Sequence, residues 1–224
     1  MFAALPMYDW PGVRTATDAL WDALRDALRS VGLPAPQSLS RPFDESDWLR
    51  PDLTLAQTCG MPFRLWLHDR VTLLGAPDYG VLACPPGYYC SHIITRKGRR
   101  PTGRAGVNAL HSQSGYAVLN APNRLVLTGS HAASIRALAN GQADFAAIDA
   151  ITWMHAWREM PEAQELHIHS STSPTPGLPF ITANRDATET MQTCIEAAIS
   201  ALAKPHKAAL FLRGFVRFKP SDYR

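Results

Sequence analysis

The sequence SQSGY at residues 112–116 and the sequence TGSHAASIRAL at residues 128–138 decide the expected fold of this chain. Each is a short polar segment placed to begin a helix, and the second runs directly into apolar residues at helical spacing. The first turn of a helix leaves backbone N–H groups without an intrahelical acceptor, and the helix dipole adds positive potential there. Two such helix starts that converge on one cleft form an anion site without a metal.

The composition is that of a globular chain of ordinary size. Its 224 residues are 46% hydrophobic and 18% charged, which suits one large domain or two small ones. The formal net charge is only +3, and the one basic run is residues 96–100. A nucleic-acid-binding surface needs a denser stripe of Lys and Arg, and no apolar run is long enough to cross a bilayer. We therefore expect neither a nucleic-acid partner nor insertion into a membrane.

The four cysteines, Cys59, Cys84, Cys90 and Cys194, do not predict a metal site. None forms a Cys-x-x-Cys pair, which is the usual spacing of zinc sites and of thioredoxin-like redox motifs. Cys84 and Cys90 flank a Pro-Pro-Gly turn at residues 85–87, so they can form a disulfide or remain two buried thiols. We expect no metal and no cofactor.

Apolar residues recur at helical or at strand spacing along most of the chain. Strands alternate with helices, and this order predicts sheets that carry helices on their faces. The tail from residue 215 has no clear pattern. The predicted strands are residues 2–7, 34–40, 52–57, 71–75, 88–95, 106–108, 125–128, 143–149, 166–169 and 180–183, and the predicted helices are residues 15–31, 62–68, 130–140, 151–158, 186–203 and 205–211.

Two segments interrupt this order and predict a chain of two lobes. A Pro-Pro-Gly break precedes the β-prone residues 88–95, and residues 170–179 are rich in Ser, Thr and Pro. We interpret both segments as crossings between lobes. The predicted lobe I is discontinuous, with residues 1–83 and 167–224, and lobe II is the inserted segment 84–166.

Polar residues follow the ends of several predicted strands in both lobes. In open α/β sheets, ligands bind beyond the carboxyl ends of the strands. We therefore expect a single cleft between the lobes, faced by Tyr8, Thr58, Ser112, Ser114, Ser130, His131 and Asp149.

The order of these segments resembles that of the substrate-binding proteins of phosphate, phosphite and phosphonate ABC transporters, which have the type 2 periplasmic-binding-protein fold. The residues that carry the resemblance are 112–116, the sequence GSHAASI at 129–135, the sequence ALANGQAD at 137–144, and Asp149. The resemblance implies an α/β fold of two lobes, each a mixed sheet flanked by helices, with two hinge crossings between them.

The same resemblance implies roles for individual residues. In that family the Ser-x-Ser-Gly turn holds the phosphonate oxygens, which assigns Ser112, Gln113 and Ser114 to the ligand. The His of the Gly-Ser-His segment also donates to the oxyanion, and here it is His131. Aromatic residues from both lobes close over the ligand, with Tyr8 and Tyr89 as candidates, and Asp149 lies near the place of the carboxylate that faces an amine. The implied partner is an ABC permease.

Each candidate residue also has a purely structural interpretation. Ser112 and Ser114 can be helix N-caps, since Ser is a preferred residue at that position. His131 can cap its own helix or pack beside Trp153. Asp149 can cap the helix that follows it.

Three functions remain open from the sequence. The leading hypothesis is a non-catalytic protein that binds a small oxyanion, phosphonate-like or phosphate-like, by closing two lobes over it. The second is a cytoplasmic enzyme on the same scaffold, such as a cofactor-biosynthesis protein, with His131, Asp149 and Cys59 as acid/base groups. The third is a ligand sensor that signals to a partner protein. The sequence shows no nucleophile elbow, Walker loop or metal-ligand spacing, which favours the first.

The N-terminus gives an expectation about location. Residues 2–7 are too short for the apolar region of a signal peptide, and no basic segment precedes them. From the sequence as given we expect a cytoplasmic protein, whereas the family role implies the periplasm.

Overall fold

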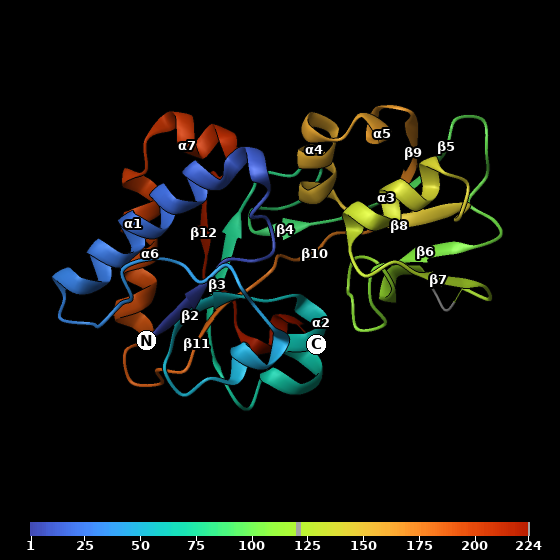
Figure 1. Cartoon of the computed structure of the whole chain (residues 1–224). Helices are drawn as coiled ribbons and strands as arrows, with labels where there is room; N and C mark the ends of the chain where they lie inside the picture. The colour runs from blue at the N-terminus through green and yellow to red at the C-terminus, as the bar shows by residue number, and fades with distance from the viewer. Residues whose placement is uncertain (120–121, 224) are drawn as a thin grey trace. The chain divides into compact units, whose positions relative to one another are not determined.

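The computed structural model describes residues 1–119 and 122–223, which form two compact units (Figure 1). Unit 1 comprises Met1–Tyr88 together with the segment from Pro176 to the end of the described chain, and unit 2 comprises Tyr89–Thr175. Unit 2 is thus inserted into the sequence of unit 1, and the chain passes between them twice. Two short strands, β4 (Tyr88–Tyr89) and β10 (Thr175–Pro176), pair with each other at these passages.

Unit 1 contains a five-stranded mixed sheet in the order β1-β2-β11-β3-β12. Strands β1 and β2 are parallel, whereas β11 runs antiparallel to both β2 and β3. Strands β1, β2 and β3 therefore point the same way and end at one edge of the sheet. The bounds are β1 (Phe2–Ala4), β2 (Leu53–Gln57), β3 (Thr72–Asp78), β11 (Phe180–Thr182) and β12 (Gly214–Val216).

Helices cover both faces of this sheet. On one face, Leu24 and Leu28 of α1 and Ile195 of α6 share a hydrophobic core. On the other face, Trp48 and Phe63 belong to a second core. The helices are α1 (Arg14–Ser30), α2 (Gly60–Pro62), α6 (Thr188–Ala201) and α7 (Lys204–Ala209), with 3₁₀ turns η1 (Pro11–Val13), η2 (Glu45–Leu49) and η5 (Pro220–Tyr223) and a π-helical turn η3 (Phe63–Leu67).

Unit 2 contains a second five-stranded mixed sheet, in the order β7-β6-β8-β5-β9. Strand β6 is parallel to both β7 and β8, and β5 is antiparallel to β8 and β9. Helix α3 packs on β6 and β8, and α4 packs on β8 and β5. The bounds are β5 (Ser91–Arg96), β6 (Ala105–Val107), β7 (Leu125–Leu127), β8 (Phe145–Asp149), β9 (Leu166–Ser171), α3 (His131–Ala139), α4 (Ala150–Glu159), α5 (Pro161–Gln164) and a 3₁₀ turn η4 (Ala117–Leu119).

These sheets and helices confirm the predicted α/β class, but one predicted strand does not form. Residues 34–40 run as a loop with Ala35 and Leu39 buried in the core of unit 1. Arg29 of α1 holds this loop by donating to the Ala35 carbonyl at 2.7 Å. The two prolines in the segment lack the N–H groups that a strand donates. The prediction was wrong because one-sided burial of a loop leaves the same apolar alternation as a strand.

The C-terminal tail, which we expected to lack a clear structure, is an integral part of unit 1. Strand β12 pairs antiparallel with β3 at the edge of the sheet. The turn η5 then buries Tyr223, whose hydroxyl donates to the Gly177 carbonyl at 2.8 Å. Elements of three and four residues leave little periodic signal, so the pattern of the sequence missed them.

Two further strand predictions need correction at their ends. The strand expected at residues 2–7 ends at Ala4, and the single strand expected at residues 88–95 is split into β4 and β5 by Cys90. The Cys90 carbonyl accepts the Ala150 N–H at 3.0 Å instead of a strand partner. No helix among the described residues has both the length and the apolar character needed to span a membrane.

Candidate functional site

The carboxyl ends of three parallel strands meet at one edge of the unit 2 sheet. Asn108 follows β6, the segment before α3 follows β7, and Asp149 ends β8. Ser91, the first residue of β5, lies opposite Asp149 in the antiparallel register. This topology brings polar residues from distant parts of the sequence to one edge, as expected for the ends of parallel strands.

The segment SQSGY forms a single helical turn and not the helix that we predicted. The Ser112 hydroxyl accepts the Gly115 N–H at 3.0 Å, and the Ser112 carbonyl accepts the Tyr116 N–H at 3.2 Å. Ser112 thus caps the turn, which continues into the 3₁₀ turn η4 within the described residues. Pro122 follows soon after, and a proline cannot donate the backbone N–H that a helix interior needs. The sequence contains a helix start here but little room for a helix.

Gly115 allows Asn108 to approach this turn closely. A side-chain carbon built at Gly115 would overlap the Asn108 Oδ1 atom and lie 3.1 Å from the Ser112 Oγ atom. The Asn108 Oδ1 atom is buried and has no hydrogen-bond partner among the described residues. Sequence reasoning missed Asn108, although its place at the end of β6, just before the SQSGY turn, was a usable signal.

The second polar segment does begin a helix, as predicted. Ser130 is the N-cap of α3, and its hydroxyl accepts the Ala133 N–H at 3.1 Å. Gly129 before it has φ of +86°, a backbone conformation that favours glycine. Thr128 Oγ1 lies 2.7 Å from Ser134 Oγ, which ties the end of β7 to the first turn of the helix.

One hydrogen bond joins the two polar segments. The Ser114 Oγ atom lies 2.9 Å from the His131 Nε2 atom, and the Ser114 side chain is buried. The His131 Nδ1 atom is also buried and has no hydrogen-bond partner among the described residues. We call Asn108, Ser112, Ser114 and His131 the Ser-His cluster.

Burial keeps His131 uncharged at neutral pH. It lowers the pKa of the imidazole to about 4. A neutral imidazole carries one N–H donor and one acceptor nitrogen. Either Nε2–H donates to Ser114, which leaves the Ser114 proton free, or Ser114 donates to Nε2, which leaves Nδ1–H free. In both tautomers the pair of side chains retains one donor for a further partner.

Asp149 caps the helix that follows it, which is the structural alternative considered above. Its Oδ1 atom accepts the Ile151 N–H at 2.8 Å and the Thr152 N–H at 2.9 Å, and its side chain is buried. A carboxylate at a helix N-terminus is stabilised by the unpaired N–H groups and by the helix dipole. The carboxylate of Asp149 is therefore directed at α4.

The remaining candidates in unit 2 differ in exposure. Gln113 is half-buried, and its amide makes no hydrogen bond within the described part of the chain. Tyr89 is buried at the end of β4. Ser130 is exposed and serves as the α3 cap.

The two unit 1 candidates lie beyond the carboxyl ends of β1 and β2. The Tyr8 ring packs edge-on against Tyr79, with the ring centroids 5.0 Å apart. Thr58 is fully buried, its N–H donates to the Pro179 carbonyl at 3.0 Å, and its hydroxyl donates to the Cys59 carbonyl at 3.4 Å. Both side chains are thus packed into unit 1.

A partly exposed ion-pair network of unit 2, formed by Arg96, Arg104 and Asp144, lies at the other edge of its sheet. Arg104 precedes β6 and donates to the Asp144 carboxylate through its backbone N–H at 2.8 Å and its Nε at 3.1 Å. Arg96 donates to the Leu138 carbonyl at 2.6 Å and to the Ala143 carbonyl at 2.9 Å. These guanidinium contacts hold the pKa of Asp144 well below its usual range. The Ser-His cluster, in contrast, offers only neutral donors.

A model of a known protein family matches the part of the chain that contains this cluster. The family is described as the periplasmic substrate-binding protein of phosphonate ABC transporters, and the match covers residues 108–224, slightly more than half of the chain. The match begins at Asn108 and includes every residue of the Ser-His cluster. No curated protein sequence matches the chain.

Several solved structures share the fold at low sequence identity. PhnD1 from Prochlorococcus marinus (MIT 9301), in complex with methylphosphonate, has a TM-score of 0.72 at 13% identity, with 100% of this chain and 94% of that chain covered. A binding protein component of an ABC phosphonate transporter from Pseudomonas aeruginosa has a TM-score of 0.69 at 16% identity, with 99% and 82% covered. XAC2383 from Xanthomonas citri, bound to chloride, has a TM-score of 0.71 at 16% identity, with 99% and 92% covered.

The family match and the fold lead to the same conclusion. The similar structures establish the type 2 periplasmic-binding-protein fold that the order of segments predicted. The family model adds the class of ligand and the transport system. The chain belongs to the family of periplasmic substrate-binding proteins of phosphonate ABC transporters.

Proposed function

We propose that this chain binds a phosphonate through the Ser-His cluster, with Gln113 and the start of α3 as further donors. The observation that carries the proposal is the 2.9 Å contact between Ser114 and His131, which joins the two polar segments. It leaves the His131 Nδ1 atom buried without a partner among the described residues. A buried polar atom without a partner costs free energy, so a ligand that bonds to it gains affinity. PhnD1, which has the same fold, binds methylphosphonate.

Neutral donors are suited to this ligand. The first turn of α3 leaves backbone N–H groups without intrahelical acceptors, and the helix dipole favours an anion there. The hydroxyls of Ser112 and Ser114 and the neutral ring of His131 add directed donors. Arg96 and Arg104 are held by their own partners at the opposite edge of the sheet. We infer that hydrogen bonds, and not a guanidinium, stabilise the bound anion.

The capping role of Asp149 limits the ligand class further. An aminoalkyl phosphonate carries an ammonium group that needs a carboxylate partner. The Asp149 Oδ1 atom already accepts two N–H groups from α4. We therefore propose a preference for simple alkyl phosphonates over aminoalkyl phosphonates.

The geometry supports binding over catalysis. A histidine 2.9 Å from a serine hydroxyl can also act as the general base that activates the serine as a nucleophile. In such enzymes a carboxylate orients the other ring nitrogen. The His131 Nδ1 atom has no carboxylate partner within the described part of the chain. We infer a non-catalytic role, in keeping with the family.

The same family membership supports a proposal about partner and location. We propose that the chain delivers its ligand to an ABC permease and acts in the periplasm. The contributions of Tyr8, Thr58 and Tyr89 to the ligand site stay predictions from the sequence.

Isothermal titration calorimetry tests the proposed ligand. We expect methylphosphonate to bind more tightly than phosphate, sulfate or 2-aminoethylphosphonate. Ser114→Ala should weaken methylphosphonate binding by about 10- to 100-fold, because it removes a hydrogen bond to a charged group. Ser173, an exposed serine of unit 2, provides the control, and Ser173→Ala should bind as the parent protein does.

Two results would contradict the proposal. Absence of both binding heat and a change in melting temperature with methylphosphonate would remove the phosphonate assignment. Tighter binding of 2-aminoethylphosphonate would show that Asp149 or another acidic group serves the ligand, and the preference for alkyl phosphonates would be wrong.

A further inference from the structure

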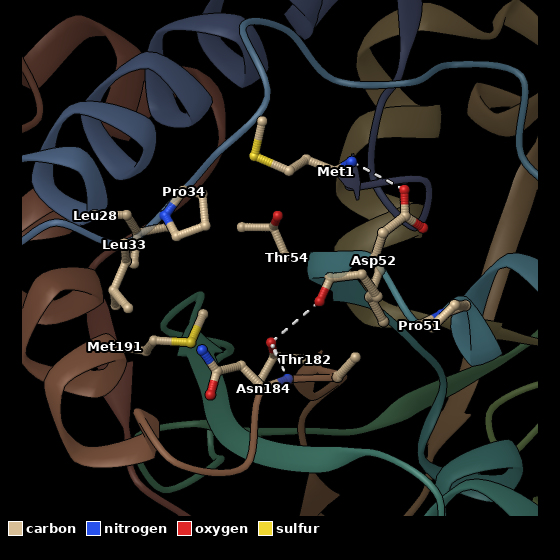
Figure 2. A pocket seen from close by; sticks show the side chains of 12 residues that line it. Met1, Leu28, Leu33, Pro34, Pro51, Asp52, Thr54, Thr182, Asn184 and Met191 are labelled. Carbon is tan, nitrogen blue, oxygen red and sulfur yellow. Dashed lines mark hydrogen bonds and ion pairs between the residues drawn. The ribbon is translucent and has the colours of Figure 1, made fainter.

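A separate pocket of about 200 Å³ lies within unit 1 (Figure 2). It forms where the end of α1 and the first turn of α6 meet the start of β2 and the end of β11. Leu28, Met191, Thr54 and Thr182 mark these four elements. Thr58 follows the other end of β2, so the pocket lies at the opposite edge of the unit 1 sheet from that ligand candidate.

One side of this pocket is apolar. Leu28, Leu33, Pro34 and Met191 gather there and face Thr54 across the opening (Figure 2). Native interiors contain few voids larger than a water molecule, and an engineered apolar cavity of about 150 Å³ holds benzene. A pocket of this size and lining therefore suits a ring-sized apolar body.

The pocket also offers hydrogen-bond donors. The Thr54 hydroxyl lies at the centre of the view and makes no hydrogen bond to any described residue (Figure 2). The Asn184 Oδ1 atom accepts the N–H groups of Asp186 and Ala187, while its amide nitrogen makes no hydrogen bond within the described residues. Thr182 differs, since its hydroxyl donates to the Leu53 carbonyl and accepts the Asn184 N–H. Thr54 and Asn184 can therefore donate to an oxygen atom of a ligand.

The charges beside the pocket are paired with one another. Asp52 lines the pocket, where it accepts hydrogen bonds from Arg50 at 2.9 Å and from the amine of Met1 at 2.9 Å. These donors lower the pKa of Asp52, so its carboxylate stays charged. Because the charge of Asp52 is paired with Arg50 and with the Met1 amine, neither a cationic nor an anionic ligand finds an unpaired charge of opposite sign among the described residues of the pocket. Burial of an ionic group without such a partner costs free energy, which favours a neutral ligand.

We infer that this pocket, which we name the Thr54 pocket, binds a small neutral molecule with a ring-sized apolar body and one carbonyl or hydroxyl oxygen. The apolar body contacts Leu28, Leu33 and Met191. The oxygen accepts a hydrogen bond from the Thr54 hydroxyl. This site shares no residue with the Ser-His cluster and is independent of phosphonate binding.

Methionine-methyl NMR with cyclohexanone as the probe tests the inference in the intact chain. The sequence has six methionines, of which Met1 and Met191 line the pocket and Met154 and Met160 lie in unit 2. We expect a saturable shift of the Met191 methyl with a dissociation constant of about 1 mM, while the two unit 2 methyls do not move. Cyclohexanecarboxylate, an anion with the same ring, should bind about 10-fold more weakly or not at all, because its carboxylate loses water without gaining a cationic partner.

Two variants separate the apolar and polar parts of the inference. Leu33→Trp fills the pocket and should abolish the Met191 shift. Thr54→Val retains the shape of the side chain, removes the hydroxyl, and should weaken cyclohexanone binding by about 5- to 10-fold. Both variants should keep the melting temperature and the methylphosphonate affinity of the parent protein, which shows that they are folded.

The contrary results are equally specific. A drift of all methionine methyls without saturation, or a full response in Leu33→Trp, would overturn the pocket as a binding site. Equal binding of the carboxylate would overturn its preference for a neutral ligand. Unchanged affinity in Thr54→Val would overturn the role of the hydroxyl.

Discussion

The two sheets place strand ends at comparable edges, but the chemistry at these edges differs. In unit 2 the ends of β6 and β7 carry Asn108 Oδ1 and His131 Nδ1, two buried polar atoms without partners among the described residues. In unit 1 the ends of β1 and β2 carry Tyr8, packed against the ring of Tyr79, and Thr58, whose hydroxyl already donates to a backbone carbonyl. Position at a strand end therefore does not by itself give a side chain unmet hydrogen-bonding capacity. Unmet hydrogen-bonding capacity distinguishes Asn108 and His131 of unit 2 from Tyr8 and Thr58 of unit 1.

This difference has an energetic meaning. Folding of unit 2 buries Asn108 Oδ1 and His131 Nδ1 without a partner among the described residues, and each such atom costs about 1–3 kcal/mol. The Ser114–His131 bond offsets only part of this cost, because it satisfies one ring nitrogen and leaves the other. A ligand with several acceptor oxygens recovers the rest on binding. At Tyr8 and Thr58 of unit 1, no buried side-chain polar atom without a partner adds such a free-energy cost.

The largest expected effect comes from a substitution in unit 2 that tests whether the turn at residues 112–116 holds the ligand. Gly115→Ala places a methyl group where the Asn108 Oδ1 atom lies, so the turn must move. We expect binding of methylphosphonate to weaken by about 100-fold, because several directed hydrogen bonds to a charged group are displaced together. Overpacking should also lower the free energy of unfolding by about 1–3 kcal/mol. Calorimetric titration and urea unfolding measure the two effects.

Gly214 provides a matched control for this substitution. A side-chain carbon at Gly214 meets nothing within 4 Å. Gly214→Ala, in β12 of unit 1, should therefore leave both binding and stability close to those of the parent protein. If Gly115→Ala binds methylphosphonate normally, the turn at residues 112–116 does not hold the ligand.

The second effect concerns the dependence of stability on pH. The pKa of His131 is about 4 in the folded chain, below the ordinary value of about 6.5 in an unfolded chain. As the pH falls below about 6.5 the unfolded state takes up a proton first, so stability is fully present above that pH and declines toward pH 4. The shift corresponds to a loss of about 3 kcal/mol in the free energy of unfolding. Urea unfolding at a series of pH values measures it.

The variant His131→Gln isolates this contribution. His155 of α4 is also buried, and its pKa is likewise lowered to about 4, so the parent protein loses stability through both rings. In His131→Gln the free energy of unfolding should decline less between about pH 6.5 and pH 4, because the contribution of the His131 ring is removed and that of His155 remains. Identical pH profiles for the two proteins would show that His131 is not buried as a neutral ring.

The parts of the site that the sequence predicted are those with local signals. Ser130 was expected at a helix start and caps α3, and Asp149 was expected either at a ligand or at a helix start and caps α4. The contact between Ser114 and His131 follows from the parallel pairing of β6 with β7, which the strand-end argument anticipated. N-caps and strand ends depend on a few neighbouring residues, so they can be recognised from the local pattern of a single sequence.

The parts that the sequence missed depend on packing between distant segments. Asn108 becomes notable only because Gly115 lets it approach the turn, which no spacing rule reveals. The Thr54 pocket arises where helix ends and strand ends from four segments meet. Residues 34–40 show the converse error, since Ala35 and Leu39 are buried by a loop and not by a strand.

The smallest expected effect comes from a substitution in unit 1 that removes a hydrogen bond whose donor and acceptor are already paired. The Tyr223 hydroxyl donates to the Gly177 carbonyl at 2.8 Å, and burial raises the pKa of this phenol well above its ordinary value, so it stays a donor at neutral pH. Tyr223→Phe should lower the free energy of unfolding by about 1 kcal/mol, because it removes one buried hydrogen bond. Methylphosphonate affinity should stay within about 2-fold, since a satisfied bond in unit 1 has no unmet capacity to offer a ligand. Urea unfolding measures the change in stability, and calorimetric titration of the same preparation measures the change in methylphosphonate affinity. A loss of affinity together with the loss of stability would mean that packing in unit 1 controls the ligand site.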